Sequence, residues 1–250
     1  MKYSFRKELL SGQKMIGTLV SLPSPQVTEM LCDAGFDWLF IDGEHAPLAM
    51  GDIQNILQAA GNRCPCVVRI PAHDEVFIKQ VLDMGAPGII VPHVNTAEIA
   101  AQVVSFAKYP PVGTRSVGVA RASGYGFQFE DYVRNANEQL AVVVQIEHVE
   151  AARNIESILD VEGIDAAFIG PYDLSASMGK PGQISDPDVQ RYMGQVRDAC
   201  LRRKKPIGIF AISVEDARPY VNQGYTLIAV QVDTLMLGQA ARDVLAGIKK

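Results

Sequence analysis

The sequence predicts an α/β fold in which residues 1–250 form a single (β/α)8 TIM barrel. Eight short apolar segments, rich in β-branched residues, alternate with stretches of helical periodicity along the chain. The apolar segments are not interrupted by polar residues, which is typical of parallel strands buried on both faces. A length of 250 residues is also usual for such a barrel. An open doubly wound sheet often has a glycine-rich first turn, and the turn LVSLPSPQ contains no glycine.

The expected strands and helices follow one another in a regular order. The strands are expected at MIGTLV (15–20), DWLFID (37–42), CVVRI (66–70), GIIVP (88–92), AVVVQIE (141–147), DAAFIG (165–170), PIGIFA (206–211) and TLIAVQVD (226–233). The first helix follows Ser24-Pro25 and ends at Gly35, since a capping residue, a proline and a final glycine commonly bound a helix. Later helices are expected at about 51–61, 74–85, 96–109, after Val149, and at about 171–204, 214–224 and 234–248.

The segment 109–140 departs from this order. It is rich in glycine, arginine and aromatic residues, and we expect it to be a long loop insertion without a strand of its own. Long insertions on a compact barrel are usually functional or form an interface.

Composition and charge argue against several classes of partner. The net charge is -5 and no run of five or more lysines and arginines occurs, which argues against binding to nucleic acid. The apolar runs are too short to span a membrane, and the first residues do not resemble a signal peptide. The four cysteines lack the spacing of a redox pair or a metal site, so we expect free thiols and a cytoplasmic protein.

Polar side chains follow most of the expected strands, at the barrel end where active sites lie. They are Asp42-Gly43-Glu44-His45, Arg69, Pro92-His93, Gln145-Ile146-Glu147-His148, Gly170-Pro171-Tyr172-Asp173 and Asp233. Glu147 and Asp173 end neighbouring strands, and two carboxylates without cysteine suit Mg²⁺ or Mn²⁺. Two alternatives remain open: Asp173 caps the following helix, or the two residues are a glycosidase acid/base pair.

Arg69 and His45 are the expected reactive side chains. The planar guanidinium of Arg69 suits a carboxylate or a developing enolate oxygen, and a structural salt bridge is the alternative. His45 is a candidate general base, oriented by Asp42 or Asp83; the alternative is a loop histidine held by the backbone. His148 is expected to support Glu147, and His93 is left without a role.

Two absences narrow the chemistry. The ten lysines (2, 7, 14, 79, 108, 180, 204, 205, 249 and 250) are all expected on helices, loops, strand entrances or termini. A Schiff-base aldolase needs a lysine inside the barrel, so imine chemistry is excluded. The turns FAISVED and QVDTLM contain no glycine to cradle a phosphate, so we expect an unphosphorylated substrate.

Five segments, in order over nearly the whole chain, resemble the HpcH/HpaI-type class II pyruvate aldolases. They are FDWLFIDGEHAP (36–47), VVRIP (67–71), YPPVGTRSVG (109–118), VVVQIEH (142–148) and VEGIDAAFIGPYDLSASMG (161–179). The resemblance implies a barrel of the phosphoenolpyruvate/pyruvate-domain type and a lyase that needs Mg²⁺, Mn²⁺ or Co²⁺. Such an aldolase reversibly cleaves 4-hydroxy-2-oxo acids to pyruvate and an aldehyde. Succinic semialdehyde, tartronate semialdehyde and lactaldehyde, products of aromatic or sugar-acid catabolism, are candidates, and the sequence does not choose among them.

The same resemblance implies roles for single residues. Glu147 and Asp173 would bind the divalent ion, and Arg69 would contact pyruvate and its enolate with Gln145 nearby. His45, paired with Asp42 or Asp83, would be the acid/base, and the backbone from Gly170 through Pro171 to Asp173 would seat the pyruvate carboxylate. Tyr172 departs from the family pattern, where a smaller residue is often found, and this puts the size of the acceptor pocket in doubt.

The sequence also predicts a homo-oligomer. The last helix carries more apolar residues than are needed to seal a barrel, and the insertion presents several apolar residues with nothing to cover. These are Tyr109, Val117, Val119, Tyr125, Phe127 and Phe129. The resemblance implies dimers that exchange the last helix and form a hexamer. Arg121 could then reach a neighbour's barrel mouth, with an ordinary surface arginine as the alternative.

Two other functions are compatible with a barrel of this kind. A CoA-thioester lyase of the citramalyl or malyl type would share the metal carboxylates, but it would want a basic surface for the CoA phosphates, and the chain is acidic. The second alternative is a barrel that binds a ligand without catalysis. Loss of Glu147, Asp173, Arg69 or His45 would indicate such a protein, and all four are present.

Overall fold

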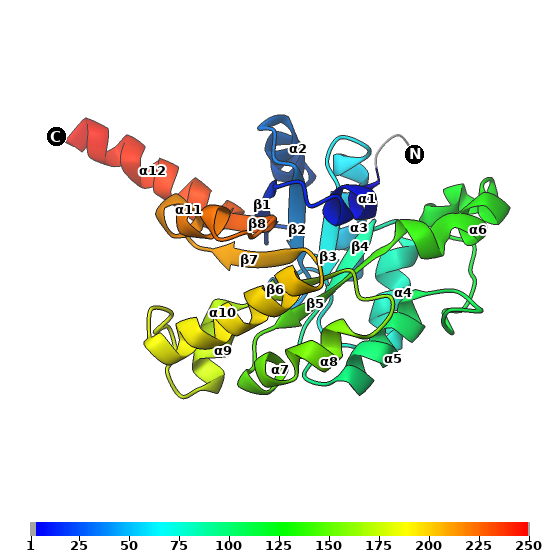
Figure 1. Cartoon of the computed structure of the whole chain (residues 1–250). Coiled ribbons are helices and arrows are strands. Elements are labelled where there is room, and N and C mark those ends of the chain that lie inside the picture. The colour runs from blue at the N-terminus through cyan, green and yellow to red at the C-terminus, as the bar shows by residue number, and fades with distance from the viewer. Residues whose placement is uncertain (1–3, 250) are drawn as a thin grey trace.

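The computed structural model describes residues 4–249 and confirms the barrel: eight parallel strands close in the order β1 to β8 (Figure 1). The strands are β1 (Met15–Val20), β2 (Trp38–Asp42), β3 (Cys66–Arg69), β4 (Gly88–Val91), β5 (Ala141–Ile146), β6 (Ala166–Ile169), β7 (Ile207–Ala211) and β8 (Leu227–Val232). Each expected strand is therefore present, and no boundary is displaced by more than one residue.

Helices follow the strands, and all of them except the last cover the outer face of the barrel (Figure 1). They are α2 (Pro25–Asp33), α3 (Met50–Ala60), α4 (Glu75–Asp83), α5 (Ala97–Ala107), α7 (Val149–Arg153), α8 (Ile155–Leu159), α9 (Pro171–Ser177), α10 (Pro187–Arg202), α11 (Val214–Asn222) and α12 (Asp233–Lys249). Most begin at a side-chain cap: Ser24, for example, accepts a hydrogen bond from the backbone N–H of Val27. In the described residues, no helix is both long and apolar enough to cross a membrane.

Three further elements were not expected. The helix α1 (Phe5–Leu10) precedes the barrel, and the segment 109–140 contains a short 3-10 helix η1 (Arg121–Gly126) and the helix α6 (Phe129–Gln139). The segment is thus partly helical and not only a loop. The sequence of α6 has apolar residues at helical spacing, namely Phe129, Tyr132, Val133 and Ala136, but it is otherwise polar and only Ala136 is buried along it.

The interior of the barrel is filled with aromatic side chains. Phe40 packs against Trp38 and Phe168, with ring centroids 5.9 and 5.4 Å apart. The ring centroid of Phe5, on α1, lies 6.3 Å from that of Trp38, so α1 closes the amino end of the barrel. The packing is tight enough that a Cβ at Gly208 would lie 2.3 Å from Cδ2 of Phe168. Because this end is plugged, small molecules reach the barrel interior only at the carboxyl end of the strands.

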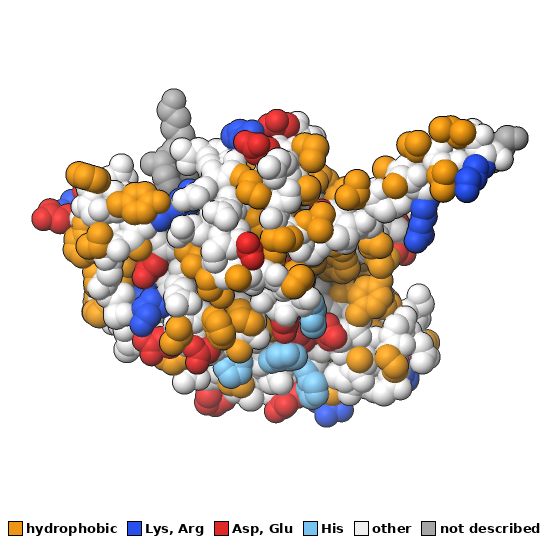
Figure 2. Space-filling view, turned by 180° about the vertical axis from the view of Figure 1, so that it is seen from behind, with side chains coloured by type: hydrophobic (Ala, Val, Ile, Leu, Met, Phe, Trp, Pro, Cys, Tyr) orange, Lys and Arg blue, Asp and Glu red, His pale blue; other side chains and the backbone are white. Residues whose placement is uncertain are grey.

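The last helix leaves the body of the molecule. In Figure 1, α12 extends away from the barrel toward the C-terminus, and Figure 2 shows apolar side chains along the same arm. Five large apolar side chains on it are exposed: Leu235, Leu237, Val244, Leu245 and Ile248. A single copy of the chain provides no surface that covers them.

Candidate active site

A cavity of about 570 Å³ opens at the carboxyl ends of the strands, where the sequence predicts the site. Its lining includes eight of the expected site residues: Asp42, His45, Arg69, Gln145, Gly170, Pro171, Tyr172 and Asp173. The structure thus brings together side chains from β2, β3, β5 and the start of α9, which are far apart in the sequence. On this face, histidine and acidic side chains gather beside one another (Figure 2).

Glu147 follows β5 and is almost fully buried. Its Oε1 accepts a hydrogen bond from the backbone N–H of His93 at 2.7 Å, and its Oε2 accepts one from Nε2 of Gln145. A Cβ at Gly170 would lie 3.1 Å from Cβ of Glu147, so glycine at that position leaves room for the carboxylate. The carboxylate is therefore held by two donors at the base of the mouth, and its position is fixed before any ligand binds.

Glu44 and His93 join Glu147 in a cluster that the sequence did not single out. One ligand atom from each of the three lies within 4.8 Å of the other two. His93 Nδ1 is 3.2 Å from Glu147 Oε1, and its Nε2 is 3.6 Å from Glu44 Oε1. The backbone of His93 has φ of 55°, which is uncommon for a residue other than glycine. This conformation, which turns its backbone N–H to Glu147, could not be predicted from residue types.

The charge state of Glu44 is set by its surroundings. Burial raises the pKa of this carboxyl, the Arg69 guanidinium opposes the rise, and the neighbouring Glu147 adds to it. Glu44 Oε2 lies 3.1 Å from Nη1 of Arg69 but accepts no hydrogen bond of good geometry. Gln145 Oε1 is likewise buried without a donor. Neither oxygen accepts a hydrogen bond of good geometry from a described residue, although Glu44 Oε2 is paired electrostatically with Arg69. Both can accept a hydrogen bond from water bound to a hard divalent ion.

Arg69 is buried and strongly held. Its Nε and Nη2 lie 3.0 and 2.7 Å from Oδ1 of Asp42, and the guanidinium lies 5.2 Å above the ring of Phe40. Asp42 Oδ1 also accepts the backbone N–H groups of Glu44 and His45, each at 3.1 Å. Asp42 therefore positions Arg69 and the loop after β2. In this arrangement the Asp42 carboxylate lies beyond 4.0 Å from the nitrogens of the His45 imidazole, and the expected pairing of Asp42 with His45 stays a prediction.

The His45 side chain is 65% exposed, and its Nε2 lies 3.9 Å from Oε2 of Glu44. Among residues 4–249, this is the only carboxylate within 4.0 Å of the imidazole. Within one chain, the Asp83 carboxylate does not approach the His45 imidazole. Asp83 is the last residue of α4, which runs antiparallel to the strands and ends at the amino end of the barrel, and it pairs with Arg115 at 2.5 Å. One chain therefore does not bring Asp83 to His45, and the expected pairing of these two residues stays a prediction.

Asp173 lies in the first turn of α9, where Gly170 is the N-cap and Pro171 is the first residue. Its side chain is exposed and lines the cavity. No described residue donates a hydrogen bond to it, so it is free to move toward an ion. His148, by contrast, has a structural role: it is the N-cap of α7, and its Nδ1 accepts the backbone N–H of Glu150 at 3.2 Å.

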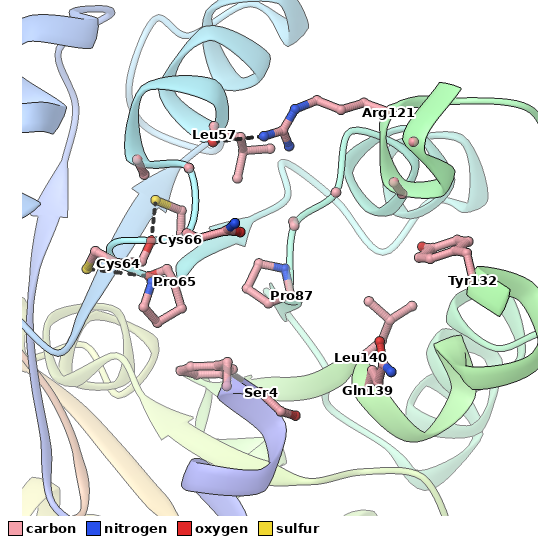
Figure 3. A pocket seen from close by; sticks show the side chains of 18 of the residues that line it. Ser4, Leu57, Cys64, Pro65, Cys66, Pro87, Arg121, Tyr132, Gln139 and Leu140 are labelled. Carbon is pink, nitrogen blue, oxygen red and sulfur yellow. Dashed lines mark hydrogen bonds between the residues drawn. The ribbon is translucent and has the colours of Figure 1, made fainter. Parts of the chain in front are cut away.

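Arg121 lies far from the mouth of its own barrel. It borders a second cavity, of about 310 Å³, at the amino end of the barrel (Figure 3). Its Nη1 donates to the carbonyl of Met84 at 2.7 Å and its Nη2 to the carbonyl of Leu57 at 3.3 Å. These carbonyls lie near the ends of α4 and α3, so the guanidinium ties η1 to both helices. Arg121 is neither a free surface arginine nor a ligand of its own chain's mouth.

Lysine is absent from the lining of the mouth cavity throughout the described part of the chain. Lys108, the most buried lysine, lies at the opposite end, where its Nζ donates to the carbonyls of Asn137 and Leu140, both at 2.7 Å. Desolvation lowers its pKa to about 8. This lysine therefore lies at the opposite end of the barrel from the mouth cavity and does not line it.

Comparison with known proteins agrees with this geometry. A family model described as HpcH/HpaI aldolase/citrate lyase matches residues 16–240. The chain is 42% identical over 248 residues to 2-keto-3-deoxy-L-rhamnonate aldolase of Klebsiella pneumoniae, covering 98% of this chain and 92% of that protein. It is 43% identical over 249 residues to 4-hydroxy-2-oxo-heptane-1,7-dioate aldolase of Escherichia coli, with 98% and 95% covered. A crystal structure of an HpcH/HpaI aldolase/citrate lyase family protein from Burkholderia cenocepacia superimposes with a TM-score of 0.94, at 36% identity, covering 98% of each chain.

Proposed function

The chain belongs to the HpcH/HpaI aldolase/citrate lyase family and is an aldolase, and we propose that it cleaves 4-hydroxy-2-oxo acids to pyruvate and an aldehyde with the help of a divalent ion. The observation that carries the proposal is the grouping of carboxylates beside Arg69 at the carboxyl end of the barrel. The relatives named for 4-hydroxy-2-oxo-heptane-1,7-dioate and 2-keto-3-deoxy-L-rhamnonate support this substrate class.

We propose Glu147 and Asp173 as the ligands of the ion, which is Mg²⁺, Mn²⁺ or Co²⁺. Glu44 and His93 flank Glu147 and complete an oxygen-rich surrounding that suits these ions. When bound, the ion would supply a Lewis acid for the carboxylate and keto oxygens of the substrate. The buried acceptors on Glu44 and Gln145 support the fit, because a metal-bound water could donate to each of them.

We assign a separate role in the cleavage reaction to each of several side chains in the mouth. Arg69, held by Asp42, is proposed to lie beside the keto oxygen and to stabilise the enolate that forms as the C3–C4 bond breaks. His45 accepts the proton of the 4-hydroxyl, and the electrons of the C3–C4 bond move to the enolate while the aldehyde leaves. A proton added at C3 then gives pyruvate. The backbone from Gly170 to Asp173 is proposed as the seat of the substrate carboxylate, and condensation follows the reverse course.

A coupled assay tests this function. The purified protein should release pyruvate from a 4-hydroxy-2-oxo acid, and the rate should depend on added Mg²⁺, Mn²⁺ or Co²⁺. Borohydride together with pyruvate should leave both the mass and the activity unchanged, because no lysine lines the mouth. A pyruvyl-lysine adduct on the active protein would disprove the metal-enolate route. Cleavage of citramalyl- or malyl-CoA without cleavage of any 4-hydroxy-2-oxo acid would favour the CoA-lyase alternative.

We further propose that the protein is a homo-oligomer in which α12 packs on a neighbouring copy, because five large apolar side chains are exposed on this helix. Light scattering should give a mass well above 27.2 kDa. Leu237→Glu should lower that mass, whereas Gln239→Glu, which adds the same charge at an exposed polar residue of α12, should not. A fully active monomer would contradict the proposal. A cytoplasmic location is proposed from the four cysteines, all of which are free thiols.

A further inference from the structure

The mouth cavity has two chemically different sides. Asp42, Arg69, Gln145 and Asp173 lie on the side formed by β2, β3, β5 and the start of α9. The opposite side is formed by β7, β8, β1 and the loop after β1, which are consecutive around the closed barrel. If the pyruvate half of the substrate faces the carboxylates and Arg69, the remaining carbons extend toward this second side.

We infer that the second side accepts a neutral aldehyde with an apolar chain, in preference to a semialdehyde that carries a carboxylate. This inference rests on the proposed aldolase function and specifies its substrate. The residues that carry it are Leu22, Pro23, Phe210 and Val232 on the second side, together with Tyr172, which begins α9 but has its ring beside Phe210. The polar residues on this side, Ser21 and Thr234, are uncharged.

An aromatic pair dominates this wall. The rings of Tyr172 and Phe210 have centroids 6.5 Å apart, and both side chains are only partly buried. Apolar carbons of a bound aldehyde would lose water against these rings at a gain in free energy.

Cations are scarce in the same cavity. Within residues 4–249, its lining contains one arginine, Arg69, and no lysine. The Arg69 guanidinium is already close to two carboxylates, those of Asp42 and Glu44. A second carboxylate on the substrate would give up its hydration against apolar side chains, without a cation of its own and near several acidic residues. Such an uncompensated charge is strongly disfavoured.

A matched pair of acceptors tests the inference. Butanal and succinic semialdehyde have the same four-carbon chain, ending in a methyl group or a carboxylate. In the condensation with pyruvate, kcat/KM for butanal should exceed that for succinic semialdehyde by at least about tenfold, since an unpaired charge in an apolar site costs more than 1.4 kcal/mol. The wild-type ratio decides the inference without any variant.

Two substitutions add a test of the wall itself. Phe210→Arg should shift the ratio toward succinic semialdehyde by at least about tenfold, whereas Phe210→Leu keeps an apolar side chain and should retain the preference for butanal. Val232→Lys serves the same purpose if Phe210→Arg does not fold. A Phe210→Leu ratio that inverts like that of Phe210→Arg would contradict a role for the added charge.

The remaining outcomes separate this inference from the function on which it rests. Equal or better use of succinic semialdehyde would overturn the inference and leave the aldolase function intact. If neither aldehyde is used while the C3 protons of pyruvate exchange with deuterium in a metal-dependent way, enolate formation stands and the neutral-acceptor inference is overturned. If neither condensation nor exchange occurs, the proposed function fails and the inference fails with it.

Discussion

Glu147→Gln is expected to lower kcat by about three orders of magnitude. Lewis-acid stabilisation of an enolate by a bound ion is worth several kcal/mol, and each 1.36 kcal/mol corresponds to a factor of ten in rate. Glutamine keeps the shape of the side chain but loses the negative charge. It also places an amide beside two groups that donate hydrogen bonds to the carboxylate in the wild-type protein, the backbone N–H of His93 and Nε2 of Gln145. The variant should therefore bind the ion more weakly and hold it in a less favourable position.

The measurement combines kinetics with direct binding. Chelation by EDTA should abolish turnover of the wild-type protein, and Mg²⁺, Mn²⁺ or Co²⁺ should restore it. Mn²⁺ binding followed by electron paramagnetic resonance should weaken in Glu147→Gln. Glu150→Gln, which removes an exposed carboxylate on the adjacent helix α7, is the matched control and should behave like wild type. Full activity of Glu147→Gln after chelation would rule out this residue as a metal ligand.

The barrel could be predicted from sequence because its strands are defined by local composition. Several apolar runs end at a polar residue, as β2 does at Asp42 and β3 at Arg69, and these boundaries also mark the end of the barrel where the site lies. The helices α1 and α6 were missed for the opposite reason. The six-residue α1 is too short for a periodic pattern, and α6 is mostly polar and gains its contacts from η1 and α1.

Which residues gather at the mouth was predictable, but how they pair was not. Asp42 was expected to orient His45, and in this structure its carboxylate bonds to Arg69, because β2 and β3 are in a register that places Asp42 beside Arg69. Asp83 is occupied by the fully buried Arg115, which lies between the rings of Tyr109 and Tyr132. Pairings of this kind depend on register and on loop paths, and residue type alone carries no information about either.

The pairing of Asp42 with Arg69 leads to the second large effect: Arg69→Lys should lower kcat by at least about tenfold. The guanidinium reaches Asp42 through Nε and Nη2 and Glu44 through Nη1 at the same time. A lysine ammonium is a single point charge and cannot hold both carboxylates while also facing an enolate oxygen. The positive charge would remain in the mouth, but its donors would no longer be fixed where negative charge develops.

The kinetic pattern identifies what Arg69 does. If Arg69 acts on the enolate, kcat and kcat/KM should fall together while the affinity for Mn²⁺ stays nearly unchanged, because Arg69 is not a metal ligand. Arg63→Lys is the control, since Arg63 is an exposed arginine that also pairs with an aspartate, Asp33, at 3.0 Å. A rise in KM at constant kcat would show instead that Arg69 only anchors the ground state. In that case the stabilisation of the enolate would have to come from the ion held at Glu147, and the Glu147→Gln effect should be correspondingly larger.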